Sequence, residues 1–174
     1  LGTQGAYRHR MGGICGHRVE GTPHRDPNFH LLVTLDATDP RLELPSSLGE
    51  VPLLYGFTYD GCELDYTVTP CGAIRLNRLT PARPSDDWPY PEYPDAFPEV
   101  PFDLDAGAAG SRTEASGFTW QGLEEPLADL TVIVPPNPAY GVSLWGPEGD
   151  SERVLVVFSI VTNTMKVSAR NQCT

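Results

Sequence analysis

Residues 55–77, Tyr-Gly-Phe-Thr-Tyr-Asp-Gly-Cys-Glu-Leu-Asp-Tyr-Thr-Val-Thr-Pro-Cys-Gly-Ala-Ile-Arg-Leu-Asn, are the stretch that decides the fold. Asp60-Gly61 is typical of a tight turn, because glycine reaches positive φ at no steric cost and aspartate tolerates it. From 62 to 68 apolar and polar residues alternate strictly, which places one set in a core and the other in water. Residues 69–72, with Pro70 and Gly72, suit a second turn. The stretch therefore predicts a β-meander of three short strands.

Short apolar stretches bounded by turn residues recur along the chain and predict further strands, at 29–36, 51–58, 117–120, 131–134, 140–145, 153–160 and 164–170. In the first of these, Leu32 adds an apolar side chain to the second face, so we expect that strand to be covered on both sides. Pro126 limits the one helical candidate, 123–130, to a turn or two. The sum predicts a single all-β domain over 1–174, an antiparallel β-sandwich or an irregular barrel with very little helix.

Two segments differ in composition from the predicted strands. Residues 1–28 are a basic, glycine-rich arm, in which 11–14 suggest a tight turn. Residues 80–117 begin with a proline-rich stretch that also holds many acidic and aromatic side chains. Because proline cannot donate to a sheet ladder, we expect a long extended loop there and no central strand. Loops of this length are usually functional or disordered.

The charge balance narrows the classes of partner. The 174 residues include 23 Asp and Glu against 12 Lys and Arg, a formal net charge of −11. Such a surface repels phosphate backbones, which argues against nucleic-acid binding. The apolar runs are far shorter than the roughly 20 residues that a membrane-spanning helix needs, so we expect no membrane span. No leader peptide is visible, and we expect a soluble cytoplasmic protein of bacterial type, with secretion left open.

Four cysteines, Cys15, Cys62, Cys71 and Cys173, allow three pairings and impose none. Cys62 and Cys71 lie at opposite ends of one predicted strand, about 30 Å apart at about 3.3 Å per residue. A disulfide needs Cα atoms within about 7 Å, so these two should not bond to each other. A bond between Cys15 and Cys173 stays open, and we favour reduced thiols.

Cys15 and His17 are the candidate metal ligands. With other histidines nearby in sequence, they offer the sulfur and nitrogen ligands that zinc prefers. Their spacing matches no standard zinc motif, and the alternative is that histidines simply cluster in a basic arm. Apart from this zinc candidate, the sequence predicts no cofactor.

Trp88, Tyr90 and Tyr93 are the candidate ligand-binding residues. Interleaved with prolines and acids, their rings would present stacking faces to a carbohydrate, a small ligand or a peptide. The alternative is that the rings dock inward and hold the long loop against the body of the domain.

Several landmarks resemble the YwqG-like family of uncharacterised bacterial proteins. They are Gly12-Gly13, the strand 31–36 with the later strand 52–55, and Trp145-Gly146 leading into the strand 154–158. The resemblance covers most of the chain and implies a β-rich fold. The family brings no agreed activity and no catalytic residues.

The sequence favours an acidic binding or interaction module that docks a basic protein partner, since a net field raises association rates. One alternative is carbohydrate or small-ligand binding through the aromatic loop. Another is an enzyme that uses a Cys–His pair, such as Cys71 with His30. Neither Gly-x-Ser-x-Gly nor His-Glu-x-x-His occurs, so we lean against an enzyme.

Overall fold

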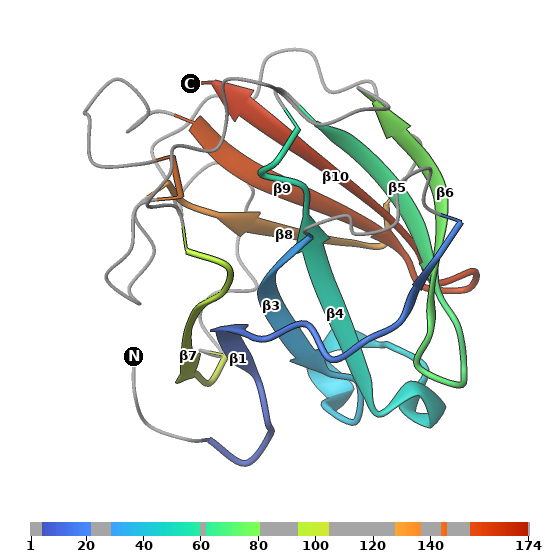
Figure 1. Ribbon diagram of the computed structural model, residues 1–174. Coiled ribbons are helices and arrows are strands. Elements are labelled where there is room, and N and C mark those ends of the chain that lie inside the picture. The colour runs from blue at the N-terminus through green and yellow to red at the C-terminus, as the bar shows by residue number, and fades with distance from the viewer. Residues whose placement is uncertain are drawn as a thin grey trace.

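The computed structural model describes residues 5–21, 29–59, 62–80, 94–104, 128–136, 144–145 and 154–173. Within them, ten β-strands form two sheets that pack face to face, and helix is limited to two 3-10 turns (Figure 1). The predicted all-β fold with very little helix is therefore confirmed, and its two separate sheets make it a sandwich and not a closed barrel. No helix in the described residues has the length and apolarity needed to cross a membrane.

The smaller sheet has four strands in the order β4-β3-β1-β7, all paired antiparallel. Their bounds are β1 Arg10–Gly13, β3 His30–Asp36, β4 Glu50–Tyr55 and β7 Phe97–Pro101. Every residue of β3 is buried, which confirms that this strand is covered on both faces. The 3-10 turns η1 Pro40–Leu42 and η2 Ser46–Leu48 connect β3 to β4.

The larger sheet has six strands in the order β2-β6-β5-β10-β9-β8. Their bounds are β2 Val19–Glu20, β5 Glu63–Val68, β6 Ile74–Thr80, β8 Leu130–Val134, β9 Val154–Val161 and β10 Lys166–Cys173. The short β2 runs parallel to β6, and all other pairs are antiparallel. The strands predicted at 131–134, 153–160 and 164–170 are confirmed as β8, β9 and β10. The stretch 117–120 lies outside the described residues, and of the strand predicted at 140–145 only 144–145 are described, where they form a turn and not a strand.

The alternation that predicted β5 is confirmed, with one exception. Leu64, Tyr66 and Val68 are buried in the core, whereas Glu63 and Thr67 are half-exposed. Asp65 is only 9% exposed. It pairs with the Nε of Arg78 at 3.1 Å, and this partner compensates its charge.

The predicted three-stranded meander is wrong in its first strand. β5 and β6 form the expected hairpin, but β4 belongs to the other sheet and pairs with β3. Alternation identifies a strand without identifying its partner. One side chain nevertheless links the two sheets here: the Tyr66 hydroxyl donates to Pro52 O at 2.9 Å and accepts the Leu54 N–H at 3.0 Å.

The tight turn expected at 11–14 is instead a bulged strand. β1 pairs with both β3 and β7, and its register against β7 shifts between Met11 and Gly13. Gly12 and Gly13 have φ of +69° and +93°, which other residues rarely adopt. A Cβ on Gly12 would overlap the carbonyl oxygen of Pro98, so the absent side chain lets β1 approach β7.

The loop expected over 80–117 contains a strand, β7, and that expectation is corrected accordingly. Pro98 and Pro101 are tolerated because β7 lies at a sheet edge, where one side of the strand needs no ladder donors. Phe97 is 2% exposed and belongs to the hydrophobic core. The basic arm is likewise part of the sandwich where it is described, since it supplies β1 and β2.

Candidate interaction site

Residues 94–104, which we call the acidic segment, connect the core to a set of exposed carboxylates. At its start, His30 donates from Nε2 to Pro94 O at 2.8 Å. His30 is 3% exposed, and burial lowers its pKa, an effect that the Pro94 carbonyl and the Asp95 charge oppose. The Phe97 ring lies 5.5 Å from the His30 ring, between ring centroids, and 5.9 Å from that of Phe57. A buried histidine and a core phenylalanine thus fix this end of the segment.

The middle of the acidic segment is β7, which places its charges in solvent. Asp95, just before the strand, and Glu99 within it are exposed. Glu99 Oε2 lies 3.6 Å from the Nε of Arg10, and the Glu99 side chain is 62% exposed. Arg10 makes its shorter bonds elsewhere, to both carboxylate oxygens of Glu50 at 2.8 Å. The Glu99 carboxylate therefore stays largely available to a partner.

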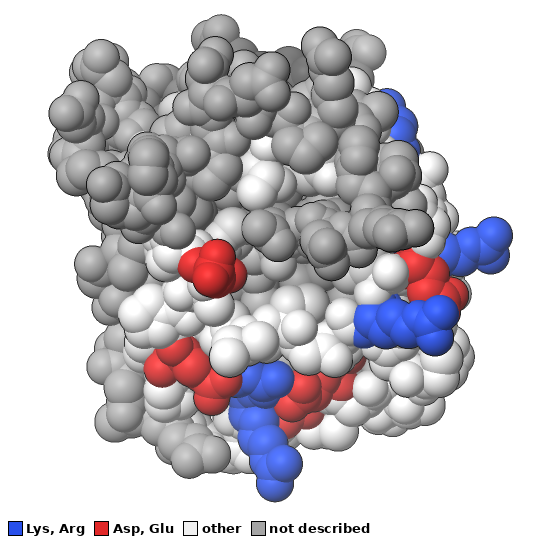
Figure 2. All heavy atoms as spheres, viewed as in Figure 1, with Lys and Arg blue, Asp and Glu red and all other residues white. Residues whose placement is uncertain are grey.

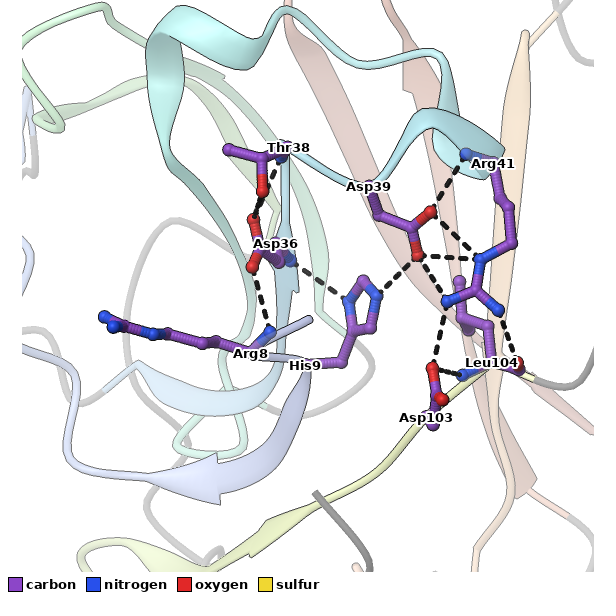
Figure 3. Close-up of polar contacts among 8 residues, drawn as sticks. All are labelled: Arg8, His9, Asp36, Thr38, Asp39, Arg41, Asp103 and Leu104. Atoms are coloured by element: carbon purple, nitrogen blue, oxygen red, sulfur yellow. Dashed lines mark hydrogen bonds and ion pairs between the residues drawn. The ribbon is translucent and has the colours of Figure 1, made fainter. Parts of the chain in front are cut away.

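The end of the segment is held by four side chains, His9, Asp39, Arg41 and Asp103, which we call the clamp (Figure 3). His9 and Asp39 are each 1% exposed. His9 Nδ1 accepts the Asp36 N–H at 3.1 Å, so the ring proton is on Nε2, which donates to Asp39 Oδ2 at 2.9 Å. The His9 ring stacks on Phe102 at 5.5 Å between centroids, and Phe102 N–H donates to His9 O at 3.1 Å.

Arg41 joins the buried and the exposed halves of the clamp. It donates to both Asp39 oxygens, with Nε and Nη2 at 2.7 to 3.0 Å, and Nη2 also donates to Asp103 Oδ1 at 2.9 Å. Its Nη1 donates to Leu104 O at 2.6 Å. Hydrogen bonds from Arg41 hold the pKa of Asp39 well below its usual range, and those to Asp39 and Asp103 raise the pKa of Arg41. The clamp satisfies its own charges, so its geometry fits a positioning role.

Charged side chains of the described residues differ in whether they have a short ion pair. Arg10, Arg41 and Arg78 all have carboxylate partners within 3.0 Å. Figure 2 shows carboxylates beside Arg and Lys side chains on the described part of one face. Asp95 and Glu99 have no such short ion pair among the described residues. They are the negative charges that the fold leaves available on the acidic segment.

The candidate metal ligands lie at another place, beside the β5–β6 turn. Cys15 Sγ is 3.8 Å from His17 O, and burial raises the pKa of the Cys15 thiol. His17 Nδ1 is 2.9 Å from Gly72 O. In the described part of the chain no three His, Cys, Asp or Glu side chains gather as a metal site. The zinc site at Cys15 and His17 stays a prediction.

The structure does not bring the suggested Cys–His pair together. His30 is buried against Pro94, whereas Cys71 is exposed in the β5–β6 turn, where the neighbouring histidine is His17. The Thr69 hydroxyl, 3.1 Å from Cys71 Sγ, lowers the pKa of that thiol. Burial raises the pKa of Cys62 to about 12, which makes it an unreactive core thiol.

Trp88, Tyr90 and Tyr93 lie outside the described residues, so their role in binding stays a prediction. The clamp was not foreseen from the sequence. His9 and Asp39 are 30 residues apart, so no local pattern joins them. The one local signal in the clamp is Asp39-Pro40, a pair that favours a turn, and there Asp39 accepts from the Arg41 N–H.

Comparisons of the chain with protein-family models, with curated proteins and with solved structures found no match. The resemblance to the YwqG-like family therefore stays a prediction.

Proposed function

We propose that this chain is an acidic binding module that docks a basic protein partner through the acidic segment. The observation that supports it best is a pair of exposed carboxylates, Asp95 just before β7 and Glu99 within it, on a segment that is fixed at both ends. A site that is already ordered loses little conformational entropy when a partner binds. The net charge of −11 would also steer a basic partner to the chain.

The proposed module acts in the cytoplasm, where thiols stay reduced. Three cysteines of the described residues, Cys15, Cys62 and Cys71, are free thiols. Its partner would present lysine or arginine side chains at the spacing of the two carboxylates. Docking of this kind depends on ionic strength, because rim charges act mainly on the rate of encounter.

The test is a calorimetric titration with decalysine, a probe that carries only positive charge. The double variant Asp95→Asn/Glu99→Gln should bind decalysine about fivefold more weakly, since each exposed pair contributes well under about 1 kcal/mol. The control is Glu63→Gln, which removes a half-exposed carboxylate that is already paired with Arg78 on the other sheet. Equal losses in both variants would show that the attraction is not located on the acidic segment, and no binding in low salt would overturn the proposed function itself.

A further inference from the structure

The two sheets end in four outer strands, and three of them have features that oppose pairing with another chain. Edge strands expose free N–H and C=O groups, and proteins protect them with proline, short length or covering side chains. β7 contains Pro98 and Pro101, which have no N–H. In β4, Pro52 lacks an N–H, and the Tyr66 hydroxyl occupies Pro52 O and Leu54 N–H. β2 has only two residues.

The fourth outer strand, β8, has none of these features. Its sequence is Leu-Thr-Val-Ile-Val, without proline or charge, and residues 130–133 are half-exposed. Among the described strands it pairs only with β9. Asp129 N–H donates to Ile160 O at 3.0 Å. The Ile160 carbonyl therefore faces β8, and because Leu130 is its register partner, Leu130, Val132 and Val134 form the hydrogen-bonded pairs with β9. The N–H groups of Thr131 and Ile133 then point away from β9.

We propose that β8 binds an extended strand of a cationic partner, which adds to the six-stranded sheet by backbone hydrogen bonds. This rests on the proposed function for the charge of the partner and adds the site and the mode of binding. Added strands gain affinity from main-chain bonds and specificity from alternate side chains. On the core side of β8, Leu130 and Val132 pack against the hydrophobic core. The partner strand should therefore place apolar, β-branched residues on that face and lysine or arginine on the other.

Charge decides between a foreign strand and a second copy of this chain. Two copies would each bring a net charge of −11, and this repulsion opposes β8–β8 pairing. Asp129 adds a fixed negative charge at the start of β8. It is exposed, and its Oδ2 accepts from Thr162 N–H at 2.8 Å and lies 3.1 Å from Thr162 Oγ1. A cationic strand satisfies both the free backbone edge and this carboxylate.

The test compares two peptides that differ only in backbone donors. One alternates lysine and valine over about ten residues, and the other has the same sequence with alternate peptide nitrogens methylated. Both have the same charge and side chains, but the methylated peptide cannot pair along one edge. The full chain should bind the methylated peptide at least about tenfold more weakly, as expected for several lost hydrogen bonds. Equal affinities would overturn strand addition.

A protein variant locates the pairing. Ile133→Pro removes one outward N–H and leaves the bonds to β9 intact, so it should weaken binding of the unmethylated peptide about tenfold and leave decalysine binding unchanged. Unchanged affinity for the unmethylated peptide would overturn the location on β8. If this variant does not fold, the comparison of the two peptides still tests strand addition.

The two proposals can fail separately. If decalysine binding depends on Asp95 and Glu99 but the two lysine–valine peptides bind equally well, the proposed function stands and strand addition does not. Dimers of the free chain in sedimentation would show that a second copy occupies the edge and would also overturn it.

Discussion

β7 and β8 are both outermost strands, one on each sheet, and they become strands for different reasons. β7 contains two prolines and a glutamate, and its own residues favour an extended loop. It is a strand because Phe97 enters the core, β1 pairs with it, and His30 and the clamp hold its two flanks. β8 consists mainly of β-branched residues that favour a strand locally. β7 is a strand because of its tertiary contacts, whereas β8 is a strand because of the local preference of its residues.

The same difference gives the two edges different binding chemistry. β7 offers side-chain charge at Glu99, with Asp95 beside it, and has few free backbone donors. β8 offers backbone donors and a single neighbouring charge, Asp129. A basic partner would therefore meet side chains on one edge and main chain on the other.

The largest effect should come from removing the core contact of β7. Phe97→Ala should lower the free energy of unfolding by about 3 to 5 kcal/mol, because it leaves a cavity at a side chain that packs on His30 and Phe57. Val134→Ala is the matched change on β8, where the buried side chain is smaller, and it should cost about half as much. Urea unfolding measures both. If Phe97→Ala lowers the free energy of unfolding by less than Val134→Ala does, Phe97 does not anchor β7.

Loss of the buried half of the clamp should be the next largest effect. His9→Ala removes a ring that is 1% exposed and leaves both Asp39 and the Asp36 N–H short of a partner. We expect a loss of about 2 to 4 kcal/mol in urea unfolding. The exposed side of the clamp supplies the control, because Asp103→Asn keeps an oxygen that accepts from Arg41. If both variants lower the free energy of unfolding by similar amounts, the buried half of the clamp is not its main stabilising part.

The anchor at the start of the acidic segment should make stability depend on pH. Burial lowers the pKa of His30, so below about pH 6.5 the unfolded chain takes up a proton that the folded chain resists. Stability should therefore fall as the pH drops from about 7 to about 5, a window above that of the carboxylates. His30→Gln should be less stable at neutral pH, with a flatter dependence of melting temperature on pH. If the melting temperature depends on pH equally in His30→Gln and in the unchanged chain, His30 is not the cause of the pH dependence.

The smallest effect should come from the exposed carboxylate of β7. Glu99→Gln should change the free energy of unfolding by less than about 0.5 kcal/mol, because its side chain is 62% exposed and lies 3.6 Å from Arg10. Thermal unfolding measures this change in stability, and titration with decalysine measures how much Glu99 contributes to binding a basic partner. A large loss of stability would mean that Glu99 serves the fold and is not kept available for a partner.

Local patterns were enough to predict most strands and the fold class. The period of two at 62–68 identified β5, and the apolar run at 29–36 identified a strand covered on both faces. Both signals belong to residues close together in sequence, and burial enforces them directly. β9 and β10 were predicted for the same reason.

The pairing of β4 and the clamp were not predictable in this way. Whether Tyr55 continues into a meander depends on which sheet its strand joins, and its pattern of side chains is the same in both cases. His9 and Asp39 meet because β1 pairs with β3, a contact between distant parts of the chain. The interpretation of 80–117 as loop failed at Phe97 because one buried ring and one partner strand outweigh two prolines at a sheet edge.

Amide chemical shifts, measured by NMR while the lysine–valine peptide is added, test most directly that a basic partner docks on these two edges. We predict that the amides of Asp95, Glu99 and residues 130–134 shift or become protected from exchange. The amides of Glu63 in β5 and Arg78 in β6, two strands of the larger sheet that do not pair with β8, should not respond. Shifts spread evenly over all exposed carboxylates, or no shifts in low salt, would contradict docking at β7 and β8.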